Sequence, residues 1–243
     1  MKTSTFTRPD GRQYDQLRPI TFIPNFIDYP EGSVLVQWGQ TLVLCNLTIQ
    51  QGVPSWLAGQ GRGWMTAEYA LLPRSTQTRT PREIHGLKGR TQEIRRLIGR
   101  SLRMAVDLTK IGERTLLLDC DVLQADGGTR VASVTGGYLA LALALNPLIQ
   151  SGEIPPQALK PPIAAVSVGV VQGSPILDLN YAEDSQADVD MNIVMTANEE
   201  FIEVQGTAEN EPFSQEILNQ LLSLSQKGIH EIVKHQSDIL QLD

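Results

Sequence analysis

Residues 116–137, LLLDCDVLQADGGTRVASVTGG, join a strand to a helix and decide how the rest of the chain is arranged. The apolar opening, residues 116–122, predicts a mostly buried strand. The small and apolar continuation, residues 131–148, predicts a helix that packs closely on its neighbours. Between them lies a polar corner, residues 125–130 (ADGGTR). The chain therefore places a glycine corner directly between a buried strand and a helix.

This glycine corner has the composition of an anion site. Two glycines let the backbone approach a ligand without a Cβ clash, and the N–H groups at a helix start attract negative charge. Thr129 adds a hydroxyl and Arg130 adds a forked, permanently charged donor set. An ordinary strand-to-helix turn with Thr129 as its N-cap fits the same residues, so the local pattern leaves both interpretations open.

Composition limits the class of protein. The 243 residues are 41% hydrophobic but only 5% aromatic, so aliphatic side chains must fill the core. No linker is evident, and we expect a single domain over residues 1–243, with a hint of internal duplication because both halves run from a hairpin to a helix. No apolar stretch is long enough to cross a membrane unbroken, and the N-terminus lacks a signal core. Cys45 and Cys120 fit a reduced, cytoplasmic protein in which they are small core residues.

Apolar periodicity and turn residues predict the other elements. Residues 1–30 are mostly polar, with a turn at 8–12. The remaining expectations are a hairpin over 33–50, a loop over 52–63, a short ordered segment over 66–73, a polar loop over 74–89, an amphipathic helix over 91–108, a strand over 163–171, a hairpin over 191–205 and a final helix after 212. This mixture predicts an α/β protein of the α+β type, with mixed sheets packed against helices.

Charge is divided unevenly along the chain, although the net charge is −7. Residues 74–103 carry nine basic side chains and only two acidic ones, whereas residues 178–243 carry fourteen acidic side chains and two basic ones. The basic segment could bind a polyanion despite the acidic total. Attraction between the two segments, within one chain or between subunits, is the alternative.

An acidic corner over residues 178–190 is the second candidate site. It holds five carboxylates, namely Asp178, Glu183, Asp184, Asp188 and Asp190. In a strand, the side chains at 188, 190 and 192 would share one face. The solvated face of a half-buried strand explains such a run; a divalent metal site also explains it, because magnesium needs only one or two carboxylates besides its waters.

Taken together, these segments resemble the ribonuclease PH family of phosphorolytic tRNA nucleotidyltransferases over nearly the whole chain. The stretches that carry the resemblance are residues 8–12 (RPDGR), 32–36 (GSVLV), 61–76 (GRGWMTAEYALLPRST), 89–103 (GRTQEIRRLIGRSLR), 118–130 (LDCDVLQADGGTR), 183–195 (EDSQADVDMNIVM) and 203–214 (EVQGTAENEPFS). The resemblance implies a fold related to the second domain of ribosomal protein S5. It also implies a homohexamer built as a trimer of dimers.

The resemblance also implies an activity: trimming of tRNA precursors and other RNA 3′ ends by inorganic phosphate, with release of nucleoside diphosphates and a reverse reaction that adds nucleotides. The positions that match the family's phosphate-binding residues are Arg90, Gly128, Thr129 and Arg130. Asp184 and Asp190 match its catalytic carboxylates, which hold Mg²⁺ or Mn²⁺. A basic loop used for RNA contact and ring assembly is matched by Arg74, Arg79 and Arg82.

Two other functions compete with this one. The chain could be a catalytically silent ring subunit of exosome type, which the intact Arg90, Arg130, Asp184 and Asp190 argue against. It could also be an unrelated phosphotransferase that binds a nucleotide at the glycine corner. The absence of a P-loop lysine motif from the sequence argues against that function.

Overall fold

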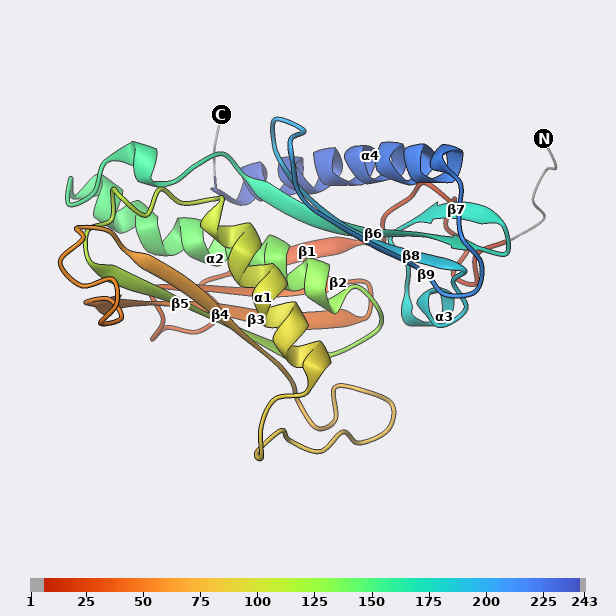
Figure 1. Cartoon of the computed structure of the whole chain (residues 1–243), viewed down its shortest axis with the longest axis horizontal. Helices are drawn as coiled ribbons and strands as arrows, with labels where there is room; N and C mark the ends of the chain where they lie inside the picture. Colours follow the sequence, from red (N-terminus) through yellow and green to blue (C-terminus); the bar gives the residue numbers. More distant parts are fainter. Residues whose placement is uncertain (1–6, 241–243) are drawn as a thin grey trace.

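The strands form two sheets in the computed structural model, which describes residues 7–240 (Figure 1). The first sheet has the order β1-β2-β3-β5-β4, with all neighbours antiparallel except β4 and β5. Its strands are β1 (Ile20–Pro24), β2 (Gly32–Trp38), β3 (Thr41–Gln51), β4 (Trp64–Leu71) and β5 (Arg114–Gln124). The second sheet is antiparallel, in the order β7-β6-β8-β9. Its strands are β6 (Ile163–Val171), β7 (Ser174–Leu177), β8 (Val189–Thr196) and β9 (Phe201–Ala208).

The helices and sheets alternate in layers (Figure 1). Helices α1 (Gly89–Arg103) and α2 (Thr129–Gln150) lie between the two sheets, and α4 (Gln215–Leu240) covers the far side of the second sheet. The short helix α3 (Tyr181–Asp184) lies beside the second sheet, and a 3₁₀ turn (Pro156–Ala158) follows α2. This arrangement agrees with the predicted mixed fold.

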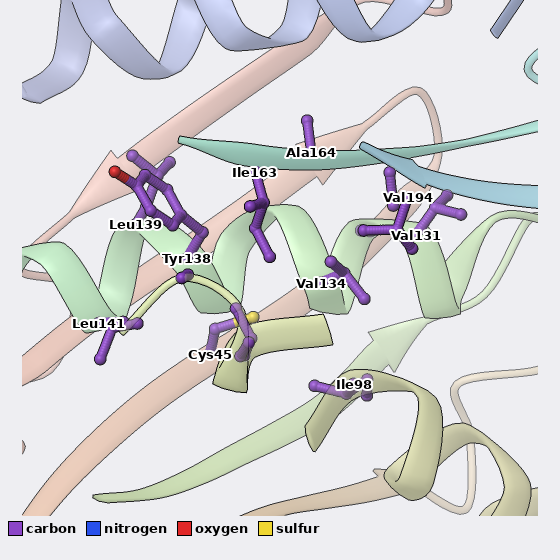
Figure 2. Packing of buried hydrophobic residues seen from close by; sticks show 14 of the residues in the cluster. Cys45, Ile98, Val131, Val134, Tyr138, Leu139, Leu141, Ile163, Ala164 and Val194 are labelled. Carbon is purple, nitrogen blue, oxygen red and sulfur yellow. The ribbon is translucent and has the colours of Figure 1, made fainter. Parts of the chain in front are cut away.

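Helix α2 is the centre of the core, and Figure 2 shows the side chains that surround it, among them Ile98, Ile163 and Val194. Its close approach to the first sheet requires small residues: a Cβ on Gly136 would collide with Val36 and meet the sulfur of Cys45 at 3.0 Å. By length and composition α2 could cross a membrane, but 72% of its most apolar window is buried inside the protein. Packing on both sides accounts for its apolar sequence.

Strand β6 is buried along its whole length because α2 covers one face and α4 the other. This explains why its sequence is a continuous apolar run and not an alternating one. Both predicted hairpins are confirmed as β2–β3 and β8–β9, and the predicted strand–corner–helix unit is confirmed as β5 and α2.

Three elements differ from the expectation. The first helix ends at Arg103 and not at residue 108, because the chain leaves it to pair with the connector, where Val106 bridges Leu159 and Ala105 accepts a hydrogen bond from the N–H of Lys160. The segment over 66–73 is the parallel strand β4. The edge strand β1 was missed, since few of its side chains are buried.

The predicted turn near Arg8 is confirmed, because the N–H of Gly11 donates a hydrogen bond to the carbonyl of Arg8.

A buried ion pair ties the N-terminal segment to the end of β7. The backbone N–H, Nε and Nη2 of Arg18 donate to the carboxylate of Asp178 at 2.7, 3.0 and 2.6 Å, and the indole N–H of Trp38 donates to it at 2.9 Å. Burial by itself would raise the pKa of Asp178, but the charge and hydrogen bonds of Arg18 outweigh it and hold the pKa below its ordinary value. Asp178 is therefore an anion inside the protein.

A second buried pair continues this network. Nε and Nη2 of Arg8 donate to the two carboxylate oxygens of Glu183 at 2.7 and 2.8 Å. Arg12 lies between the pairs, with contacts of 3.3 Å to Asp178 and 3.4 Å to Glu183. We call these five residues the buried ion network. It holds the first part of the acidic corner at two positions, Asp178 and Glu183.

Cys45 and Cys120 face each other across β3 and β5, with their sulfurs 3.9 Å apart. Both are free and buried, and burial raises the pKa of the Cys120 thiol. They are core residues, as predicted.

Breaking the buried ion network should be costly. Asp178→Asn removes the charge that compensates Arg18, and we expect the free energy of unfolding to fall by about 3–5 kcal/mol in urea titrations. The matched control is Asp15→Asn, which breaks an exposed pair with Lys227 and should cost less than about 1 kcal/mol. Equal, small losses in the two variants would contradict the role given to Asp178.

Candidate active site

The predicted phosphate and metal residues surround one pocket of about 520 Å³. Its walls come from the glycine corner, the start of α1, helix α3, strand β8 and the loop before α1. All six residues predicted for phosphate and metal line it: Arg90, Gly128, Thr129, Arg130, Asp184 and Asp190. Residues up to 100 positions apart in sequence are thus brought to one cavity.

The glycine corner is held open by left-handed backbone and by close packing. Gly127 and Gly128 have φ angles of +78° and +69°, which disfavour other residues. A Cβ on Gly127 would lie 2.7 Å from the carbonyl oxygen of Leu179 and 2.8 Å from the backbone nitrogen of Tyr181. The hydroxyl of Thr41 donates to the carbonyl of Gly127 at 2.7 Å. The backbone of the glycine corner therefore packs directly against the residues that begin α3.

Thr129 does not cap α2, so the simple N-cap interpretation is wrong. Gly128 occupies the N-cap position and no side chain caps the helix, which leaves the first N–H groups available to an anion. The hydroxyl of Thr129 instead lies 2.8 Å from that of Tyr69 on β4. Burial raises the pKa of Tyr69, so its phenol stays protonated and orients the Thr129 hydroxyl.

The two arginines reach the pocket from different helices. Arg90 lies in the first turn of α1, is exposed, and forms no ion pair with any residue in the range 7–240. Arg130 lies in the first turn of α2, where Nη1 donates to the side-chain oxygen of Gln205 at 2.9 Å and lies 3.3 Å from Oε1 of Glu93. A cation at a helix start opposes the helix dipole, so both positions favour an anionic ligand.

Glu93 and Gln205 are site-supporting residues that sequence reasoning missed. Gln205 on β9 also donates to Glu93 on α1 at 3.0 Å, so the two side chains hold the guanidinium of Arg130 from the side. Nothing in the sequence signals this contact, because the residues lie 112 positions apart. The contact depends on β9 passing beside α1.

The two predicted catalytic carboxylates lie in the same electrostatic environment. Burial and, after it, the nearby charge of Asp184 raise the pKa of Asp190 to about 6, against the lowering effect of Arg130 and Arg90. Burial also raises the pKa of Asp184, with the same two arginines opposing it. Asp190 is therefore not a fully solvated strand residue.

The other carboxylates of the acidic corner have structural roles. Asp178 and Glu183 belong to the buried ion network, and Asp188 precedes β8 and accepts a hydrogen bond from Asn210 at 3.3 Å. Asp190 and Asn192 share one face of β8, as predicted, with their side chains 3.5 Å apart. The described residues hold no cluster of three or more metal-ligating side chains. Two carboxylates suit magnesium, which keeps most of its waters.

The basic loop, residues 72–88, extends from the body of the molecule between β4 and α1 (Figure 1). Arg74, Arg79 and Arg82 are all exposed on it, as predicted for a polar loop. The same loop contributes Thr76, Gln77, Thr78 and Thr80 to the pocket wall. A polyanion held by the arginines would therefore lie next to the pocket.

Comparison with known proteins adds the family evidence. The model of the 3′ exoribonuclease family, domain 1, matches residues 16–147, and the model of domain 2 of the same family matches residues 161–228. Ribonuclease PH of Crocosphaera subtropica is 56% identical over 236 residues, covering 97% of this chain and 98% of that protein. Ribonuclease PH of Bacillus subtilis is 54% identical, covering 96% of both chains.

Solved structures share the fold at lower identity. Rice Rrp46 has a TM-score of 0.79 and 22% identity, covering 96% of this chain and all of that one. A chain of the Archaeoglobus fulgidus exosome, solved with RNA bound to the active site, has a TM-score of 0.80 and 24% identity, covering 94% of this chain and 92% of that one.

The raised pKa of Asp190 makes a testable prediction about stability. Its pKa in the folded protein, about 6, lies above the ordinary aspartate value of 3.8, so ionisation of Asp190 destabilises the metal-free fold above pH 6 and not below pH 4. Asp190→Asn should raise the free energy of unfolding at pH 8 by on the order of 2 kcal/mol, and this gain should shrink as the pH falls to 4.

Urea titrations across this pH range, with and without Mg²⁺, would check the expectation. Saturating Mg²⁺ should stabilise the wild type and not Asp190→Asn, since only the wild type keeps both carboxylates. A variant less stable than the wild type at pH 8 without metal would assign Asp190 a structural role.

Proposed function

The chain belongs to the ribonuclease PH family of 3′ exoribonucleases, and from its site we propose how it carries out the family's reaction. The enzyme is a phosphate-dependent 3′-to-5′ exoribonuclease. The observation that supports our proposal is the single pocket in which Arg90 and Arg130 lie beside Asp184 and Asp190. That arrangement suits a reaction that must bring two anions together.

Inorganic phosphate is the nucleophile, so the protein needs no nucleophilic side chain. Arg90, Arg130 and the uncapped N–H groups of α2 would bind it and orient one oxygen toward the last phosphodiester. That oxygen forms a bond to the phosphorus while the bond to the 3′ oxygen of the penultimate nucleotide breaks. The products are a nucleoside diphosphate and an RNA that is one nucleotide shorter. Because the bonds exchanged are similar, the reaction also runs in reverse from nucleoside diphosphates.

Asp184 and Asp190 would hold a divalent metal, Mg²⁺ or Mn²⁺. The pair fits such an ion because burial and, after it, the neighbouring charge of Asp184 raise the pKa of Asp190 to about 6, and a bound cation would offset both effects. When bound, the ion would offset negative charge on the scissile phosphate and the departing oxygen. The arginines are too few to neutralise both phosphates and both carboxylates unaided.

We assign the 3′ ends of tRNA precursors as the substrate, in a cytoplasmic homohexamer built as a trimer of dimers. The exposed arginines of the basic loop could bind the RNA backbone of a structured tRNA body while its single-stranded 3′ end enters the pocket. The loop has few core contacts of its own, so a neighbouring subunit would order it. The acidic C-terminal third of that subunit is the complementary surface.

The decisive experiment uses a 3′-extended tRNA with and without ³²P-labelled inorganic phosphate. The label should appear in the released nucleoside diphosphate, and omission of phosphate should stop the reaction. Release of nucleoside monophosphates, or release without phosphate, would show hydrolysis. No turnover on any RNA would favour the silent ring subunit.

Removing a phosphate-binding arginine should separate catalysis from RNA binding. Arg90→Ala and Arg130→Ala should each lower the phosphorolysis rate at least a hundredfold, because each removes a charged donor from the attacking phosphate. RNA affinity in gel shifts should change by less than about threefold, since these groups face the small anion. Arg96→Ala, on the same helix as Arg90, serves as the control. Matched losses of rate and affinity would place Arg90 and Arg130 on the RNA instead.

The basic loop should act on large RNA and on assembly. Arg79→Ala should weaken tRNA binding and shift the sedimentation pattern toward smaller species, with a smaller effect on short single-stranded RNA. Each lost phosphate contact should flatten the log–log salt dependence by about one unit or less. Lys234→Ala, which removes one exposed charge from α4, is the control. An intact hexamer with unchanged tRNA affinity would make the loop a solvated connector.

A further inference from the structure

One large apolar side chain at the pocket has no role in binding phosphate or metal. Tyr181 lines the pocket and is 56% exposed, and no hydrogen bond or ring contact restrains its side chain within residues 7–240. A single exposed aromatic ring is common on protein surfaces, but one that lines a binding pocket can contact a ligand through its apolar face. The ligand here is the end of an RNA chain.

The other pocket walls offer no second exposed aromatic ring among the described residues. The wall from the basic loop is polar, with Thr76, Gln77, Thr78 and Thr80. The second aromatic residue of the pocket, Tyr69, is only 4% exposed, and its hydroxyl is engaged with Thr129. Among the described residues that line the pocket, Tyr181 is therefore the aromatic residue whose ring is exposed.

The position of Tyr181 is fixed relative to the reacting groups. It is the first residue of α3, three positions before Asp184, so the two side chains are neighbours on one face of the helical turn. Its backbone rests on Gly127, and Asn180 and Glu183 form a capping box around the same turn. The backbone that carries the ring is thus fixed next to one of the two proposed catalytic carboxylates.

We propose that Tyr181 is the binding platform for the base of the 3′-terminal nucleotide, the one that is released. Stacking uses the face that every base possesses and reads no hydrogen-bonding edge, so it accepts all four nucleotides. That property suits an exonuclease that must remove successive nucleotides of any sequence. The assignment rests on the proposed phosphorolysis, because it places the terminal phosphodiester between the arginines and Asp184.

The test compares Tyr181→Ala, Tyr181→Phe and a control, Tyr29→Ala, which removes a tyrosine that is 98% exposed and does not line the pocket. Each is assayed in single turnover, at saturating phosphate, on a short single-stranded RNA with a normal or an abasic 3′-terminal nucleotide. Because Tyr181→Ala removes the stacking contact, it should lower the single-turnover rate constant on the normal RNA, measured at subsaturating enzyme, about five- to a hundredfold.

Four results together would support the platform. Tyr181→Ala should react slowly with the normal RNA and no more slowly with the abasic RNA. In the wild type, removal of the terminal base should lower the rate as much as the Tyr181→Ala substitution does on the normal RNA. Tyr181→Phe should retain nearly full activity, since the ring is kept, and Tyr29→Ala should behave as the wild type. An RNA that is abasic at the penultimate position should react normally.

Several outcomes would overturn the proposal. One is that the abasic terminus lowers the rate of Tyr181→Ala by the same factor as that of the wild type. Another is that Tyr181→Phe is as slow as Tyr181→Ala. A third is that removing the penultimate base lowers the rate more than removing the terminal base. These outcomes are distinct from failure of the proposed function. Phosphate-dependent release of nucleoside diphosphate by the wild type tests that function independently of any change at Tyr181.

Discussion

The buried ion pair between Arg18 and Asp178 is the interaction on which the geometry of the site depends. Asp178 ends the β6–β7 unit of the second sheet, and Arg18 lies just before the first strand of the first sheet. The same guanidinium donates to the carbonyl of Asp126 at 2.6 Å, at the glycine corner. One arginine therefore joins the first sheet, the second sheet and the corner where phosphate would bind. Because both charges are buried, neither can leave its partner without a large loss of stability.

The site is assembled at the junction of these layers. The anion-binding side comes from the starts of α1 and α2, and the carboxylate side comes from α3 and β8. Gly127 allows the two sides to meet, since any Cβ there would strike the backbone of residues 179–181. Because two arginines and two carboxylates lie at close range, their charges nearly cancel in the absence of ligands. In the proposed reaction, phosphate would bind on one side and a divalent cation on the other, which suits phosphoryl transfer between two anions.

Much of this could be predicted from the sequence. The unit of β5, glycine corner and α2 follows from an apolar run, two adjacent glycines and a long small-residue helix, all of which are local signals. Arg90, Arg130, Asp184 and Asp190 were identified through motifs that the chain shares with its family. The prediction failed where local signals are weak: β1 has few buried side chains, and α1 ends early because its last residues pair with a distant connector.

By itself the sequence determined the elements and the chemical types available, because helical and strand periodicity, turn residues and charge are properties of neighbouring positions. It also identified a family, through motifs spread over nearly the whole chain. Only the tertiary structure decided which acids are paired in the interior and which line the pocket. Asp178 and Asp190 look alike in one acidic run, yet the first is paired with a buried arginine and the second is raised to a pKa of about 6 by burial and by Asp184. The supporting contact of Glu93 and Gln205 with Arg130, and the free ring of Tyr181, likewise depend on packing between distant segments. The physical reason is that burial and charge proximity are set by three-dimensional distance, which local sequence does not encode.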